Sequence, residues 1–206
     1  MTEKIASLES PIDAMYLIHK ALRAEAARAE EAVEGLEVDA SLQSFKLVFN
    51  AWATALVYHA ELEDKFIGEP LSNGSSAAKA NSLDAAIMEM EDGLHRELVE
   101  RVQDVLDILN TEIRDQKVIT RTKQHLHRQV VTLRITQEDH LETEEALVLP
   151  ALRAQMDEQE QLEVARGLLI DGEAEDPRWI IDWVTQHLDG TERELLSGLE
   201  ARFTES

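Results

Sequence analysis

The stretch from His140 to Pro150 reads His-Leu-Glu-Thr-Glu-Glu-Ala-Leu-Val-Leu-Pro, and a similar stretch from His59 begins His-Ala-Glu-Leu-Glu and leads through an apolar run to Pro70. In both stretches a carboxylate, Glu144 or Glu63, follows an imidazole by four residues. Residues with this spacing lie on one face of an α-helix, one turn apart. Each stretch therefore predicts a helix that presents one nitrogen and one carboxylate to the same cation. This donor pair suits iron, zinc or manganese.

The composition also favours helices. Good helix formers dominate, and the chain of 206 residues has only 8 Gly and 4 Pro. No segment alternates as a strand between hairpin turns would. Ser10-Pro11 with Asp13 is typical of a helix start, and Gly35 predicts the end of that helix after Glu34.

A second helix is expected to begin near Asp39 or Ser41, and a third at Ser82. The fourth is expected to end near Leu149, because Pro150 follows. Turns are predicted at residues 72–76 and 114–117, with Thr111 as an alternative start for the fourth helix. Short helices should follow at about 157–169, after 176 and after 190. The sequence thus predicts one all-α domain over 1–206: an up-and-down four-helix bundle at about 11–153 and a helical extension at about 154–206.

The charge and the missing cysteines exclude several classes of function. The formal charge is −22, and such an acidic surface repels phosphate backbones and anionic lipids, so neither nucleic acid nor a membrane is an expected partner. The chain has no cysteine, which excludes disulfides and iron–sulfur clusters. Residues 1–10 lack the pattern of a signal peptide, and we expect a cytoplasmic protein.

Two further histidines, His19 and His95, complete a set with His59 and His140. In an up-and-down bundle, residues at one height are equidistant from the turn between their helices. The midpoints of successive histidine pairs fall at residues 39, 77 and 117–118, each at or beside a predicted turn. The four imidazoles should therefore meet at one level. Burying them with Glu63 and Glu144 would be costly without a cation, so we predict a metal centre.

The remaining histidines do not fit this arrangement. Along a helix, His127 points about 140° away from His140, and His125 lies roughly 22 Å from it along the axis. His187 lies beside Trp183 in the extension, so all three are expected to be packing or surface residues. A ferritin-like di-iron bundle would need Glu-x-x-His motifs, and only His95 has an acid three residues before it, Asp92.

This pattern resembles the hemerythrin-like family, also called HHE cation-binding domains. The family pattern is His, His-x-x-x-Glu, His and His-x-x-x-Glu or Asp on four successive helices. The resemblance covers roughly residues 11–153 and extends to the run from Glu144 to Pro150. It implies two irons bridged by an oxo or hydroxo group and by Glu63 and Glu144; other divalent metals such as zinc or manganese also suit the donors. The implied ligands are His19, His59, Glu63, His95, His140 and Glu144.

One departure concerns the third helix, where the oxygen carriers of the family have a second histidine four residues after the first. Here that position is Val99, while Glu91 stands four residues before His95 and is the best candidate for a seventh ligand. Reversible oxygen carriage is therefore not the expected function. The resemblance implies a protein that binds or senses dioxygen, nitric oxide or iron. The alternatives are a di-iron enzyme that decomposes peroxide or oxidises a small substrate, and a metal-free interaction module.

Overall fold

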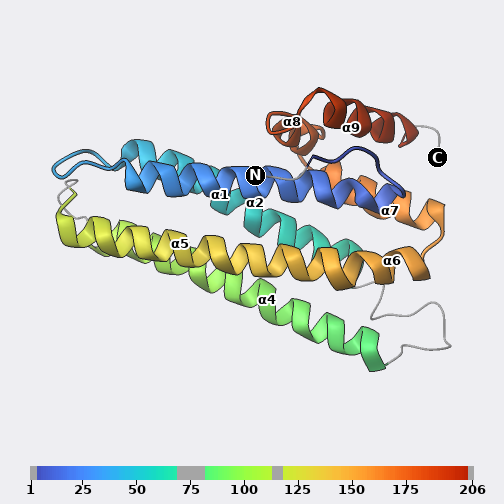
Figure 1. Cartoon of the computed structure of the whole chain (residues 1–206), viewed down its shortest axis with the longest axis horizontal. Coiled ribbons are helices and arrows are strands. Elements are labelled where there is room, and N and C mark those ends of the chain that lie inside the picture. Colours follow the sequence, from blue (N-terminus) through green and yellow to red (C-terminus); the bar gives the residue numbers. More distant parts are fainter. Residues whose placement is uncertain (1–3, 69–81, 113–117, 204–206) are drawn as a thin grey trace. The chain divides into compact units, whose positions relative to one another are not determined.

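The computed structural model describes residues 4–68, 82–112 and 118–203, and every regular element in these residues is a helix (Figure 1). The all-α prediction is confirmed. The turns predicted at 72–76 and 114–117 lie outside the described residues. None of the described helices is both long and apolar enough to cross a membrane.

Four long helices account for about half of these residues: α1 (Ala14–Glu34), α2 (Gln43–Glu63), α4 (Ser82–Asp107) and α5 (Thr120–Thr143). A 3-10 turn, η1 (Pro11–Asp13), precedes α1. Three π-helical segments continue the other long helices: η2 (Asp64–Gly68) after α2, η3 (Ile108–Glu112) after α4 and η4 (Glu144–Val148) after α5. Shorter helices follow: α6 (Leu149–Gln155), α7 (Glu158–Leu169), α8 (Trp179–Thr185) and α9 (Gly190–Arg202).

The helix starts that were predicted from capping residues are confirmed. At the first, the Asp13 carboxylate accepts hydrogen bonds from the backbone N–H of Ser10 at 3.1 Å and from its hydroxyl at 2.8 Å. At α7 and α9, the side chains of Asp157 and Asp189 accept from backbone N–H groups three residues later, at 2.9 and 3.0 Å. These bonds satisfy N–H groups that the first turn of a helix leaves without an intrahelical partner.

The second helix begins at Gln43, close to Ser41, the later of its two predicted starts, whereas Asp39 has φ 70° and belongs to the preceding turn. Two other predicted boundaries were wrong. Thr111 does not start a helix, since it lies inside η3. The fourth helix does not stop at Leu149. The Leu149 N–H donates to the Glu144 carbonyl, five residues back, and Pro150 falls in the first turn of α6, where its missing N–H costs little.

The described chain divides into two compact units. The first unit contains Met1–Ala21, Glu61–Glu89 and Leu141–Ser206, and the second contains Leu22–Ala60 and Met90–His140. Neither unit is a continuous segment, since α1, α2, α4 and α5 each contribute residues to both. The prediction of a single domain over 1–206 stays a prediction.

Ion pairs in the second unit fix the direction of two helices. Arg23 contacts Glu138 at 2.8 Å, Arg134 contacts Glu30 at 2.5 Å, and His127 contacts Glu34 at 3.5 Å. Along these pairs the α1 numbers rise while the α5 numbers fall, so α1 and α5 run antiparallel, as an up-and-down bundle requires. The Asp39 N–H donates to the Val118 carbonyl at 2.8 Å, which joins two of the turn positions that the histidine spacing predicted.

The core of the second unit contains a buried hydrogen bond among large apolar side chains. The Trp52 indole N–H on α2 donates to the Gln137 Oε1 on α5 at 2.6 Å, and both side chains are fully buried. The apolar residues of this core include Phe45, Phe49, Leu98, Val102, Val105, Leu126, Val130 and Leu133. Because a buried indole N–H needs an acceptor, this contact fixes how α2 and α5 pair.

The first unit joins the start of the chain to the helices near its end. The Glu192 carboxylate on α9 is buried and accepts from the Ile5 N–H at 3.2 Å and from the Lys20 ammonium at 2.5 Å. Asp13 receives two hydrogen bonds from Arg153 on α6. A Cβ at Gly167 would lie 2.6 Å from the Phe66 ring, so only glycine allows α7 to approach η2 this closely.

We expect Gln137→Ala to lower the free energy of unfolding of the metal-free protein by about 2–4 kcal/mol, because it leaves the indole N–H buried without its acceptor and opens a cavity. Urea denaturation measures this change. Gln124→Ala, the same substitution at an exposed site of α5, is the control and should change the free energy by less than about 0.5 kcal/mol. Equal effects of the two variants would contradict the role assigned to the Trp52 contact.

Candidate metal centre

Three candidate ligands come together in the first unit. His19 lies on α1, Glu63 is the last residue of α2, and Glu144 is the first residue of η4. Each is buried, and each offers a ligand atom within 4.8 Å of those of the other two. This is a spacing at which one cation can contact all three side chains.

The electrostatics of this group favour a positive charge. The His19 Nε2 lies 3.3 Å from Glu144 Oε2, and its Nδ1 lies 2.8 Å from Glu145 Oε1. Burial by itself lowers the pKa of His19, but the hydrogen bonds to Glu144 and Glu145, together with the charge of Glu63, raise it to about 9. A proton on His19 thus balances part of the carboxylate charge in the metal-free protein.

The second unit holds the other candidate ligands. The rings of His95 on α4 and His140 on α5 meet edge to face, with their centroids 4.8 Å apart. Glu91 Oε2 lies 3.4 Å from His140 Nδ1. All three side chains are buried, and so is His59 on α2. His95 and His140 also belong to a group whose ligand atoms lie within 4.8 Å of one another, and Glu91 does not belong to that group.

Both His-x-x-x-Glu pairs end where the helix changes type. Glu63 is followed at once by η2, and Glu144 opens η4. In both cases the imidazole lies one α-helical turn before the carboxylate on a continuous helix. π-Helical turns are rare and occur frequently at functional sites. The pattern of imidazole, carboxylate and π-helix therefore occurs twice in the chain, as the two similar sequence stretches do.

The donor set fits a metal ion. Burying Glu63 and Glu144 close together is costly unless a cation balances them. Carboxylates and imidazoles are the ligands that iron, zinc and manganese take in proteins. The buried His and Glu groups could therefore hold metal. The assignment of each predicted ligand, including Glu91 as the seventh, stays a prediction.

The structure distinguishes the proposed ligands from the other histidines and from Asp92. His127 is partly exposed and contacts Glu34 at the surface of the second unit, and His187 packs against the Trp183 ring, as predicted. Asp92, the acid that a Glu-x-x-His reading would need, is exposed, and so is Val99. A Glu-x-x-His site at His95 therefore has no support from the described residues.

Sequence reasoning missed one residue at the site, Glu145. Its carboxylate accepts a hydrogen bond from the Nδ1 of His19. The repeated pattern directed attention to Glu144, and a neighbour in an ordinary α-helix would point about 100° away. The sequence did contain a signal for Glu145. In both motifs a second acid directly follows the proposed carboxylate ligand: Glu145 follows Glu144, and Asp64 follows Glu63.

Comparison with known proteins bears on the identity of this site. The family model described as "Hemerythrin HHE cation binding domain" matches residues 10–152. The chain belongs to the hemerythrin HHE cation-binding family. All seven predicted ligands lie inside the matched residues of this hemerythrin domain, and α7, α8 and α9 lie outside them. No curated protein and no solved structure gives a significant match.

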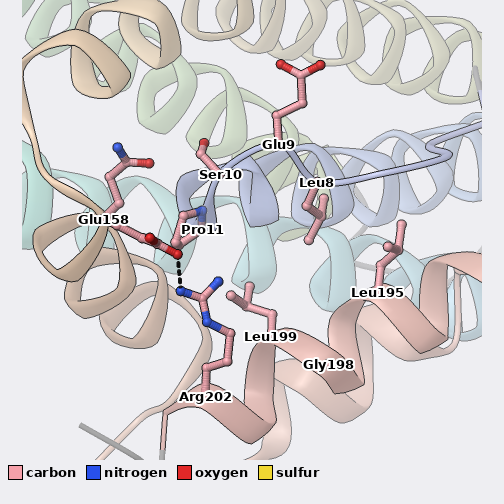
Figure 2. A pocket seen from close by; sticks show the side chains of 10 residues that line it. Leu8, Glu9, Ser10, Pro11, Glu158, Leu195, Gly198, Leu199 and Arg202 are labelled. Carbon is pink, nitrogen blue, oxygen red and sulfur yellow. Dashed lines mark hydrogen bonds and ion pairs between the residues drawn. The ribbon is translucent and has the colours of Figure 1, made fainter.

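A separate pocket lies in the first unit of the hemerythrin chain (Figure 2). Its volume is about 400 Å³, and its lining comes from residues 8–11 and from α7 and α9. Across it, the Arg202 guanidinium donates to the Glu158 carboxylate at 2.6 Å. None of the predicted metal ligands lines this pocket, so it is distinct from the candidate metal centre.

The raised pKa of His19 predicts how the stability of the metal-free hemerythrin domain depends on pH. The charged form is favoured in the folded state, so its contribution is fully present below the ordinary pKa of 6.5 and is lost as the pH rises through about 9. We expect the free energy of unfolding to fall by on the order of 3 kcal/mol over this range. Urea denaturation at a series of pH values measures the fall. His19→Gln should flatten it, and an unchanged slope in that variant would contradict the assignment.

Proposed function

We propose that this hemerythrin-like protein binds two iron ions and uses them to bind or sense dioxygen, nitric oxide or iron. The observation that supports this most is the composition of the two ligand groups. Each unit contributes histidine and glutamate side chains that are buried, although such groups are normally exposed. The proposed ligands are His19, His59, Glu63, His95, His140 and Glu144, with Glu91 as a seventh.

The number of proposed ligands favours two ions over one. A single ion of this kind takes four to six ligands, and six or seven side chains with two carboxylates can supply two ions. Glu63 and Glu144 each follow a proposed histidine ligand by one turn, and each carboxylate has two oxygens. We therefore propose that Glu63 and Glu144 bridge the ions, as the family resemblance implies.

Iron is the metal that gives this donor set redox chemistry, whereas zinc or manganese would fit the same ligands. When bound, the two irons would supply exchangeable coordination positions and electrons for a small oxygen or nitrogen ligand. The side chains of this chain hold the ions, balance their charge and exclude bulk water. His19, Glu63 and Glu144 do so in the first unit, where all three are buried.

The surroundings of His140 favour sensing or peroxide chemistry over oxygen carriage. The Glu91 carboxylate contacts His140 at 3.4 Å. It brings a negative charge close to His95 and His140 whether or not it binds metal. A nearby negative charge stabilises ferric over ferrous iron. The same observation supports the alternative function, a di-iron enzyme that decomposes peroxide or oxidises a small substrate. Metal-dependent turnover of peroxide would favour this enzyme, and a stable adduct with dioxygen or nitric oxide would favour the sensor.

We expect the purified protein to take up two iron ions per chain after anaerobic loading. Glu63→Ala and Glu144→Ala should each lose both ions, because a bridging carboxylate serves the pair, and each should also lower the stability of the loaded protein. Elemental analysis measures the metal content. His127→Ala removes an imidazole outside the proposed set and is the control. Less than one ion in the wild type, or equal losses in His127→Ala and Glu144→Ala, would contradict the proposal.

We also expect the reduced iron-loaded protein to oxidise rapidly in air and not to release oxygen on evacuation. The charge of Glu91 is the physical reason, so Glu91→Gln should slow the oxidation. The absorption spectrum, followed through repeated cycles of air and vacuum, measures both processes. A wild type that binds and releases oxygen over many cycles would restore the carrier function. If Glu91→Gln oxidises as fast as the wild type, the role of this charge is wrong.

A further inference from the structure

Glu145 contacts a proposed ligand without belonging to the proposed ligand set. The Nδ1 of the fully buried His19 ring donates a hydrogen bond to Glu145 Oε1 at 2.8 Å. On the opposite edge of the ring, Nε2 lies 3.3 Å from Glu144 Oε2. Two consecutive carboxylates therefore contact the two nitrogens of one imidazole, and all three residues belong to the first unit.

We propose that Glu145 is a positioning residue that orients His19 and fixes its tautomer for metal binding through Nε2. This inference rests on the proposed function. A metal ion replaces the extra proton of His19, and the neutral imidazole that remains has one N–H and one lone pair. The bond from Nδ1–H to Glu145 then leaves the lone pair on Nε2. Nε2 is also the nitrogen that faces Glu144, a proposed bridging ligand. A carboxylate at the second ring nitrogen of a histidine ligand fixes the ring and raises its basicity.

The two acids are adjacent at the start of a π-helical turn. Glu144 and Glu145 are the first two residues of η4, and π-helical turns occur frequently at functional sites. Neighbouring side chains diverge around the helix axis, so the two carboxylates leave the helix in different directions. This agrees with the contacts, in which each carboxylate lies against a different nitrogen of His19.

Burial separates the roles of the two acids. The Glu144 side chain is 2% exposed, whereas that of Glu145 is 24% exposed. Glu145 therefore keeps contact with solvent, whereas Glu144 is shielded from it. Through its hydrogen bond to the ring, Glu145 should make the imidazole of His19 a stronger donor and stabilise the ferric state.

Three variants separate the effect of the Glu145 hydrogen bond from the effect of its charge. Glu145→Ala removes both, Glu145→Gln keeps an oxygen acceptor for Nδ1–H but removes the charge, and Glu142→Gln removes an equal charge from an exposed position of α5. Ferrous iron titrated anaerobically against a chromogenic chelator measures affinity, and redox titration of the loaded protein measures the midpoint potential. Circular dichroism and thermal unfolding of each metal-free variant establish that it is folded.

We expect Glu145→Ala to bind ferrous iron about 10–100-fold more weakly than the wild type. Glu145→Gln should recover most of the affinity but show a higher midpoint potential, and Glu142→Gln should match the wild type in both. A folded Glu145→Ala variant with wild-type affinity, or with a loss that Glu145→Gln does not reduce, would overturn the inference while leaving the proposed function intact. A wild type that takes up no iron would overturn both.

Discussion

The buried carboxylates of Glu63 and Glu144 impose the constraint on which the rest of the first unit depends. Two acids whose oxygens lie within 4.8 Å of each other, and which are almost inaccessible to water, repel each other strongly in a medium of low polarity. Protonated His19 balances part of this charge in the metal-free protein, and its pKa is raised to about 9 although burial opposes its ionisation. A metal ion would balance the same negative charge in place of the proton. The fold thus keeps an arrangement that a purely structural core would avoid, which is why we interpret it as functional.

The sequence predicted the helical fold and a candidate metal site, and the assignment of the individual ligands stays a prediction. The spacing of His59 from Glu63 and of His140 from Glu144 repeats, and repetition makes a weak motif informative. The histidine midpoints added a test of register. Its outcome is visible in the hydrogen bond from Asp39 to Val118, which joins two predicted turn positions. The family match over residues 10–152 agrees with the extent that the motifs indicated.

What the sequence could not show is the local departure from α-helical geometry. Neither η2 nor η4 was predicted, because the sequence analysis assumed regular α-helices throughout. Pro150 was expected to stop the fourth helix, but the wider turn before it lets the chain continue into α6. Glu145 was overlooked because the repeated motif pairs each histidine with the carboxylate four residues later and gives no role to the acid that follows.

The extension beyond residue 152 contributes to the unit that contains His19. Glu192 on α9 is buried and accepts from Lys20, the residue next to His19, and from the Ile5 backbone. A carboxylate and an ammonium lose most of their hydration when they are buried, so a pair of this kind is held only where its geometry is well determined. The ordering of Lys20 restrains the same turn of α1 from which His19 extends. On the His19 ring itself, Glu145 restrains Nδ1. Two contacts from different parts of the chain thus restrain His19: Glu192 holds the side chain of its neighbour Lys20, and Glu145 holds its ring. Such support is what a metal ligand requires, because a loosely held imidazole would lose rotational freedom on every binding event.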